Sequence, residues 1–168
     1  MNVAIPKELN DLEPRVAATP GSVKQIIKSG LKVFIESGAG LNSFISDEEY
    51  QNAGATLIDS PKELLNKADI TLKVLHPSNK EIDLLKEKSV FVSLCQTTRE
   101  LETVRLLSKK KISAFSMHLI PRTTLAQKMD ALSSQANIAG YKAVLIAASR
   151  LGVYMPLLMT AAGTIRPS

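Results

Sequence analysis

The segment 121–141 carries the densest set of polar side chains that could do chemistry. If it is helical, an amide, a carboxylate, a hydroxyl and a second amide fall within about 80° of one another at about 100° per residue: Gln127, Asp130, Ser134 and Asn137. With Arg122 beside it, such a stripe could hold the polar edge of a ring such as a carboxamide. The alternative interpretation is a solvated helix face.

Two cations form a second candidate site. Arg15 lies in the polar stretch after the first predicted strand, and Lys73 lies near the end of the apolar run 70–74. Ligands of α/β sheets bind outside the carboxyl ends of strands. A charge in an apolar run is costly unless it is paired or opens into a crevice. We therefore consider a small-anion or carboxylate pocket at Arg15 and Lys73, against a surface arginine and an edge-strand lysine.

Gly38-Ala39-Gly40, with Asp59 further along, superficially resembles a dinucleotide-binding fingerprint. The third glycine position is Ser43, however, and the next helix is delayed to Ser46. In the true motif the glycines themselves open the helix, so that the pyrophosphate meets its N-terminus. The pattern favours a plain strand-to-helix turn, and the chain is expected to lack a phosphate cradle.

Composition narrows the class of protein. The 168 residues have 45% apolar content and a net charge of +5, which is typical of a globular chain. One cysteine, Cys95, excludes a disulfide framework and a cysteine zinc cluster, and the distant His76 and His118 suggest no metal site.

There is no membrane-length apolar run and no visible signal peptide, so we expect a reducing, cytoplasm-like compartment. Scattered cations and few aromatic residues argue against nucleic-acid binding.

The elements that must position these residues alternate along the chain. Apolar runs predict strands over 2–5, 31–35, 55–58, 70–74, 90–94 and 112–115. Helix-capping signals between them begin at Thr19, Ser46, Ser60, Ser78 and Thr97. This alternation predicts a three-layer α/β fold with a parallel sheet, doubly wound or flavodoxin-like.

A long helix, or two helices joined near Ser133-Ser134, is expected between Leu125 and Leu151, ended by Gly152. The tail 159–168 has small residues and no periodicity, which predicts a linker. We expect an α/β lobe over 1–132, followed by a long helix and linker over 133–168.

Several stretches resemble one protein family. Ile5-Pro6-Lys7-Glu8, the run 13–20, Glu36-Ser37-Gly38-Ala39-Gly40 and Leu72-Lys73-Val74 resemble alanine dehydrogenases and the alpha subunit of proton-translocating NAD(P) transhydrogenase. The stretches 122–141 and 160–164 are similar to the transhydrogenase side specifically. The resemblance covers the whole chain.

The resemblance implies the first of two lobes of an NAD(H)-binding component, with the true GxGxxG motif in an absent second lobe after residue 168. Arg122, Gln127 and Asp130, with Ser133 beside them, are implied to contact the nicotinamide end of NAD(H). The resemblance also implies that hydride passes from NADH to NADP⁺ on another component while protons cross a membrane domain. The cofactor does the chemistry, so no catalytic side chain is expected.

The same resemblance implies partners and a location. The implied partners are the component that binds NADP(H), the membrane domain and a second copy of the chain. It would lie on the cytoplasmic or mitochondrial matrix side, peripheral to the membrane. Alone, the chain is expected to be inactive.

Three features of the sequence depart from the resemblance. Alanine dehydrogenases place a catalytic histidine where this chain has Ser93-Leu94-Cys95-Gln96, which argues against amino-acid oxidation because that reaction needs a general acid or base. Cys95 is expected to be a buried apolar residue. Leu125 replaces an expected basic residue, and His118 an expected carboxylate, which we interpret as structural. The alternatives are an alanine-dehydrogenase-like N-terminal domain and a non-catalytic flavodoxin-like binding module.

Overall fold

The computed structural model describes residues 1–152 and 157–165 of the chain. They divide into two compact units, one spanning Met1–Pro121 and the other Arg122–Ser168. The sequence-based boundary at residue 132 stays a prediction.

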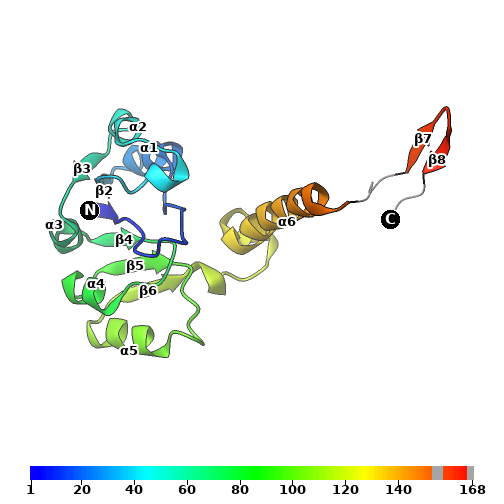
Figure 1. The fold of residues 1–168 in the computed structure, drawn as a ribbon. Helices are drawn as coiled ribbons and strands as arrows, with labels where there is room; N and C mark the ends of the chain where they lie inside the picture. The colour runs from blue at the N-terminus through cyan, green and yellow to red at the C-terminus, as the bar shows by residue number, and fades with distance from the viewer. Residues whose placement is uncertain (153–156, 166–168) are drawn as a thin grey trace. The chain divides into compact units, whose positions relative to one another are not determined.

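The first unit is built on a six-stranded parallel sheet (Figure 1). Its strands are β1 (Asn2–Ile5), β2 (Lys32–Glu36), β3 (Thr56–Ile58), β4 (Ile70–Leu72), β5 (Val90–Ser93) and β6 (Ser113–Ser116). The order is β3-β2-β1-β4-β5-β6, so the chain reverses its direction of winding between β1 and β4. This is the doubly wound order, not the flavodoxin order. The predicted α/β fold is confirmed.

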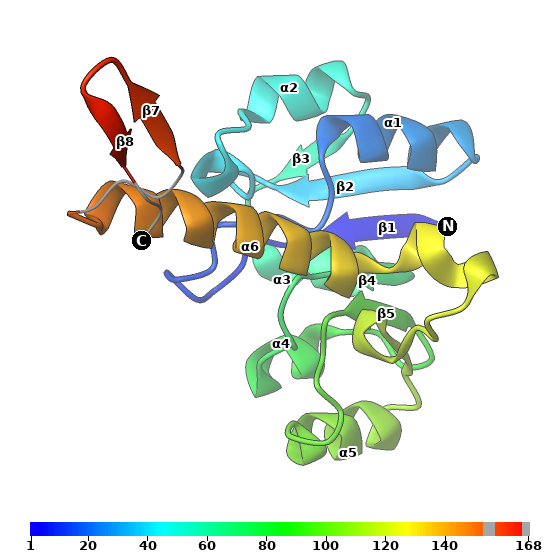
Figure 2. The same cartoon turned by 90° about the vertical axis from the view of Figure 1, so that its right-hand side faces the viewer.

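Helices cover both faces of this sheet. They are α1 (Pro20–Lys28), α2 (Asp47–Asn52), α3 (Pro61–Lys67), α4 (Asn79–Leu84) and α5 (Leu101–Lys109), with short 3-10 helices η1 (Leu41–Ser43) and η2 (Met117–Leu119). Figure 2 shows α1 and α2 at the β2–β3 end of the sheet and α4 and α5 at the β5 end.

The core follows the alternation of side chains along the strands. Val3 and Ile5 of β1 pack in one cluster with Val23 of α1 and Tyr50 of α2. Ala4, between them, packs in another cluster with Leu64 of α3. A third cluster joins α3, α4 and α5 to the β5 region: Leu65, Ile82, Leu85, Phe91, Leu107 and Ile112.

Four of the five predicted helix caps form their side-chain bond. Ser46 and Ser78 form complete capping boxes, and Thr19 and Ser60 each accept a backbone N–H from the first turn of their helix. The box predicted at Thr97 is wrong. The Gln96 carbonyl accepts the amides of the third and fourth residues after it, so the chain turns before α5 begins at Leu101.

The second unit contains η3 (Thr124–Met129), α6 (Ala131–Arg150) and a hairpin of β7 (Leu158–Thr160) and β8 (Gly163–Ile165). The predicted helix from Leu125 is wrong at its start, because Asp130 leaves helical geometry and caps α6 with its side chain. The linker expected from 159 is also wrong over 159–165, where β7 and β8 pair. Residues 166–168 of that prediction lie outside the described residues.

Candidate functional site

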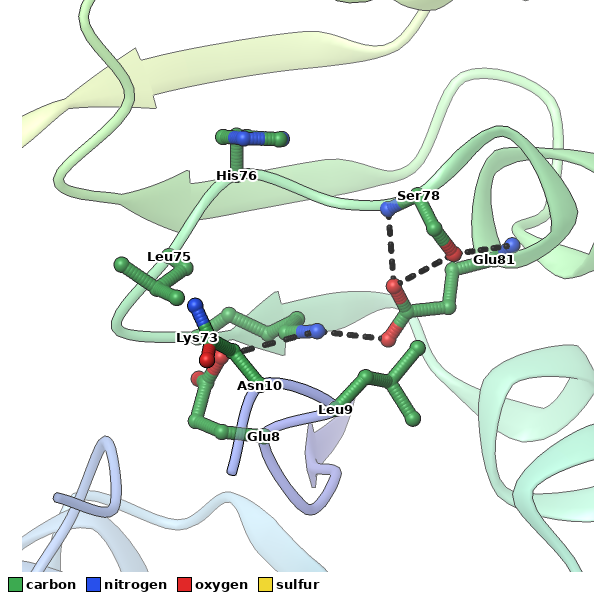
Figure 3. Close-up of a pocket in the computed structure, with 8 residues that line it drawn as sticks. All are labelled: Glu8, Leu9, Asn10, Lys73, Leu75, His76, Ser78 and Glu81. Atoms are coloured by element: carbon green, nitrogen blue, oxygen red, sulfur yellow. Dashed lines mark hydrogen bonds and ion pairs between the residues drawn. The ribbon is translucent and has the colours of Figure 1, made fainter. Parts of the chain in front are cut away.

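A pocket of about 240 Å³ opens where the carboxyl ends of β1 and β4 lie next to each other (Figure 3). Glu8 comes from the segment after β1 and Lys73 directly follows β4. This is the point at which the winding of the sheet reverses, the usual ligand position in open α/β sheets. Eight residues line it: Glu8, Leu9, Asn10, Lys73, Leu75, His76, Ser78 and Glu81.

Lys73 is the buried centre of this pocket. Its side chain is only 2% exposed, and its Nζ donates to Glu81 Oε1 at 2.6 Å. Glu8 Oε2 lies 3.7 Å from the same Nζ, and Glu8 Oε1 accepts the Val74 N–H at 2.6 Å. Two carboxylates around one ammonium leave a formal charge of −1 on the three side chains.

The N-terminus of α4 fixes the position of Glu81. One oxygen of its carboxylate, Oε2, accepts from the N–H and the hydroxyl of Ser78, both at 2.8 Å. The other oxygen is the partner of Lys73. One residue therefore completes the capping box and neutralises the buried lysine. Burial raises the pKa of Glu8, against the lowering effects of Lys73 and the Val74 amide.

Arg15 is paired with its neighbour in sequence. Its Nε and Nη2 donate to the two oxygens of Glu13 at 2.7 and 2.6 Å. Hydrogen bonding between the two lowers the pKa of Glu13 and raises that of Arg15. Arg15 is not among the residues that line the pocket at Lys73. The anion pocket at Arg15 and Lys73 stays a prediction.

Sequence reasoning missed the three carboxylates at these cations. Glu13 stands two residues before Arg15, and Glu81 stands three residues after Ser78, where the sequence predicts only a helix cap. The three glutamates are visible in the sequence. Which of them pair with Lys73 is decided by the fold, which brings Glu8 and Glu81 to its ammonium group.

The glycine turn after β2 has a structural explanation. The backbone N–H of Gly38 donates to both oxygens of the Asp47 carboxylate, at 2.9 and 3.1 Å. A Cβ on Gly40 would lie 2.6 Å from the Tyr50 ring and 2.8 Å from the Ile45 carbonyl oxygen. Asp59, the acidic residue of the apparent fingerprint, accepts from Ser37 Oγ. These contacts fit a packed turn whose amide is already taken by a carboxylate.

The polar residues of the second unit do not all lie on one helix. The Asp130 carboxylate accepts the Ser133 N–H at 2.9 Å and the Ser133 hydroxyl at 2.6 Å. Those bonds lower the pKa of Asp130, with a smaller contribution from the charge of Arg122. The predicted single stripe is wrong because Gln127 lies in the 3-10 helix η3 and Asp130 is the N-cap of α6. Of the four residues, only Ser134 and Asn137 belong to α6.

The residues that depart from the resemblance occupy different environments. Cys95 is buried, and burial raises the pKa of its thiol, as expected for a small apolar residue. His118 lies in η2, where its backbone N–H donates to Ser116 Oγ. Leu125 is 94% exposed.

Among the described residues, no group of three or more His, Cys, Asp or Glu side chains could hold a metal ion. Likewise, none of the described helices is long and apolar enough to cross a membrane.

Comparison with known proteins assigns the family. The N-terminal domain of alanine dehydrogenase/PNT matches residues 4–139. The chain belongs to this family. Its relatives in the alanine dehydrogenase/PNT family include the first part of NAD(P) transhydrogenase subunit alpha from Rhodospirillum rubrum, which is 40% identical over 100% of the chain and 45% of the relative. The alanine dehydrogenase of Methanococcus maripaludis is 33% identical over 90% of the chain and 40% of the relative.

The fold agrees with this family assignment. The crystal structure of transhydrogenase from Sinorhizobium meliloti superposes with a TM-score of 0.92 and 40% identity, covering 99% of this chain and 50% of that chain. The chain thus spans half or less of the length of the relatives it matches.

Proposed function

We propose that the chain is the N-terminal lobe of the NAD(H)-binding component of an NAD(P) transhydrogenase, which transfers hydride from NADH to NADP⁺ coupled to proton translocation. The observation that carries this proposal is similarity to a transhydrogenase subunit over the whole chain. The sequence at the end of β5, Ser93-Leu94-Cys95-Gln96, supports it because no histidine is present there to serve amino-acid oxidation.

The polar side chains around the N-terminus of α6 fit the nicotinamide end of NAD(H). A carboxamide needs an acceptor for its N–H groups and a donor for its oxygen. Asp130, with a lowered pKa, supplies a carboxylate acceptor, and the Gln127 side chain can donate and accept. Arg122 supplies a guanidinium donor. NADH, when bound, supplies the hydride.

The role of these residues is orientation. Ser133 holds the Asp130 carboxylate by two hydrogen bonds, so its position is fixed before the cofactor arrives. A fixed anion beside the ring also favours the charge that the ring gains as hydride leaves. The phosphate contacts would come from a second lobe, because the Gly38 amide is bonded to Asp47.

The proposal extends to partners and location. The component that binds NADP(H), a membrane domain and a second copy of the chain would complete the enzyme. The chain would then lie on the cytoplasmic or matrix side, at the membrane through those partners.

A chimaera tests the proposal. The chain replaces the matched segment of the Rhodospirillum rubrum subunit, which is assembled with the other transhydrogenase subunits of that organism. Hydride transfer from NADH to an NADP⁺ analogue is expected. A folded chimaera that binds its partners but transfers no hydride would refute the proposal.

The second candidate is an alanine-dehydrogenase-like activity, which the similarity to the Methanococcus maripaludis enzyme favours. The same chimaera is given alanine and NAD⁺, and NADH absorbance is followed. No turnover is expected, because Ser93, Leu94 and Gln96 cannot accept a proton at neutral pH. Steady turnover would support this second candidate.

A further inference from the structure

Lysines that are scattered along the sequence gather at one edge of the sheet. Val90 of β5 is in register with both Ile70 of β4 and Ser113 of β6, and β1 joins β4 to β2 in the same way. The turns that lead into β2, β4, β5 and β6 therefore lie next to one another, at the amino ends of the strands. We call this surface the amino edge, and it comprises residues 28–32, 67–70, 84–90 and 109–113.

The amino edge carries more net positive charge than the whole chain. Eight lysines and two carboxylates give it a net charge of +6, against +5 for all 168 residues. With strands about 4.8 Å apart, these charges spread over about 19 Å from β2 to β6. Clustered charge of one sign attracts polyanions. The lysines are Lys28, Lys32, Lys67, Lys86, Lys88, Lys109, Lys110 and Lys111, and the acids are Asp69 and Glu87.

Helix ends and ion pairs account for some of these lysines. Lys28, Lys67 and Lys109 lie in the last turns of α1, α3 and α5, where a cation favours the helix dipole. The Nζ of Lys110 donates to three carbonyl oxygens at the end of α4, at 2.6 to 2.9 Å. Lys86 pairs with Asp69 at 3.0 Å.

Lys88 and Lys111 have no such structural role. Both side chains are exposed, and neither forms an ion pair or a side-chain hydrogen bond with the part of the chain that the structure describes. Both also have left-handed backbone, with φ of 60° and 57°. This conformation is costly for residues other than glycine.

The other turns of the sheet show what local stability favours at these two positions. Lys88 and Lys111 each stand two residues before a strand, and at the same position before β2 and β3 the chain has Gly30 and Gly54, also with positive φ. Glycine would adopt this backbone without strain. Strained backbone is typical of functional positions. The two lysines therefore add exposed positive charge to the amino edge at a cost to the fold.

The composition of the amino edge favours a membrane surface over other polyanions. It has no arginine and no aromatic residue to read or stack on bases, and turns offer no helix or hairpin to enter a groove. None of the exposed large apolar side chains among the described residues lies in these four turns, whereas protein interfaces have an apolar core and are depleted in lysine. Lysine clusters of this size attract anionic lipids through charge alone.

We propose that the amino edge binds the surface of a membrane that contains anionic phospholipids, with Lys88 and Lys111 as its principal contacts. The choice of a membrane rests in part on the proposed function, which puts the chain beside one. The contact would add an electrostatic attachment to the one made through the partner components.

Sedimentation with lipid vesicles tests the proposal, using the 168-residue chain without NADH or partners. The vesicles contain phosphatidylcholine with about 30% phosphatidylglycerol, or phosphatidylcholine alone. The chain is expected to sediment with the anionic vesicles only, and to be released as salt screens the charges. No binding to the anionic vesicles, or equal binding to both kinds, would overturn the proposal. Either result would leave the hydride-transfer proposal standing, since no hydride transfer is measured.

Variants locate the contact. Lys88→Gly combined with Lys111→Gly should weaken vesicle binding about tenfold or more, because each lysine near an anionic surface contributes about fivefold. The melting temperature should not fall, because glycine suits the left-handed backbone. Lys88→Asn with Lys111→Asn replaces this variant if it does not fold, since asparagine also adopts that backbone.

The control variant combines Lys7→Gln and Lys80→Gln, which remove the same charge from exposed positions outside the amino edge. It should bind vesicles nearly as well as the unchanged chain. Equal losses in the two double variants would show that net charge, and not the amino edge, governs binding.

Two competitors distinguish a membrane from other anions. Inorganic phosphate at matched ionic strength should not displace the chain from anionic vesicles, because it offers no extended surface. A DNA duplex at the same concentration of phosphate groups should displace it only weakly. Full displacement by phosphate would assign the amino edge to a small anion, and full displacement by DNA would assign it to nucleic acid; either would overturn the proposal.

Discussion

At the scale of single residues, the two candidate cations differ in burial and in their ion-pair partners. Lys73 is buried between Glu81 and Glu8, whereas the paired Arg15 side chain is 41% exposed. Ion pairs that are exposed contribute little to stability, but breaking a buried pair leaves a charge that water cannot reach. Replacing Lys73 should therefore lower the free energy of unfolding more than replacing Arg15.

Lys73→Met should destabilise the chain by about 3–5 kcal/mol at neutral pH, because Glu8 and Glu81 would remain buried without a cation. Urea denaturation measures the change. The loss should shrink as pH falls, since protonation removes the two uncompensated charges. Lys62→Met, at an exposed position, should change stability by no more than about 0.5 kcal/mol. Equal effects of the two substitutions would contradict a structural role for the Lys73 cluster.

The nicotinamide assignment makes a second prediction at this scale. In the chimaera, Gln127→Asn and Asp130→Asn should slow hydride transfer by about tenfold to a hundredfold while weakening NADH binding less, because they act on ring orientation. Rapid mixing measures the transfer step. Asn137→Ala, which lies on α6, is the control and should leave the rate unchanged. Wild-type rates in both Gln127→Asn and Asp130→Asn would disprove the assignment.

At the scale of elements, helix ends decide where the side chains of the sites lie. The cap at Ser78 positions Glu81 against Lys73, and the cap at Asp130 sets the start of α6. The carboxylate of Glu81 completes the helix cap with one oxygen and binds Lys73, outside the helix, with the other.

Ser78→Ala should cost about 1–2 kcal/mol, because it removes a capping box and loosens the partner of Lys73. Thr97→Ala is the matched control: the sequence predicts a cap at Thr97 too, yet α5 begins at Leu101 without it. Its effect on thermal stability should be close to zero. A similar loss of thermal stability in both variants would mean that Thr97 does cap a helix.

The glycine turn gives a second pair of substitutions. Gly40→Ala should destabilise the chain by about 1–3 kcal/mol, because a Cβ would collide with Tyr50 and the Ile45 carbonyl oxygen. Gly140→Ala, in the interior of α6 with open space around it, should stabilise that helix by about 0.5–1 kcal/mol. Urea denaturation and circular dichroism measure the two effects. A tolerated Gly40→Ala would point to a looser turn than the structure has.

Sequence patterns predicted the elements better than the site. Apolar runs and capping signals were sufficient for the six strands and the α/β fold, since both are local signals. The break before α6 was missed because Asp130 also suits a polar helical stripe, and only its bond to Ser133 distinguishes the two. The pairing of Lys73 with Glu8 was missed because the two are 65 residues apart in sequence. The pairing with Glu81 was missed because the cap pattern at Ser78 already accounts for a glutamate at that position.

At the scale of the whole molecule, the chain has an α/β lobe but no free phosphate cradle at its glycine turn. The Gly38 amide is hydrogen-bonded to Asp47, and the chain covers half or less of the Rhodospirillum rubrum and Sinorhizobium meliloti proteins. We therefore expect most of the cofactor's binding energy to come from a second lobe, which leaves orientation of the nicotinamide to this one.

Calorimetric titration with NADH tests directly whether most of the binding energy comes from a second lobe. It compares the 168-residue chain alone with the chimaera that joins it to the remainder of the Rhodospirillum rubrum subunit. We expect no saturable heat for the chain alone and restored binding in the chimaera. Micromolar binding of NADH by the chain alone would contradict the division, because the cofactor would then need no second lobe.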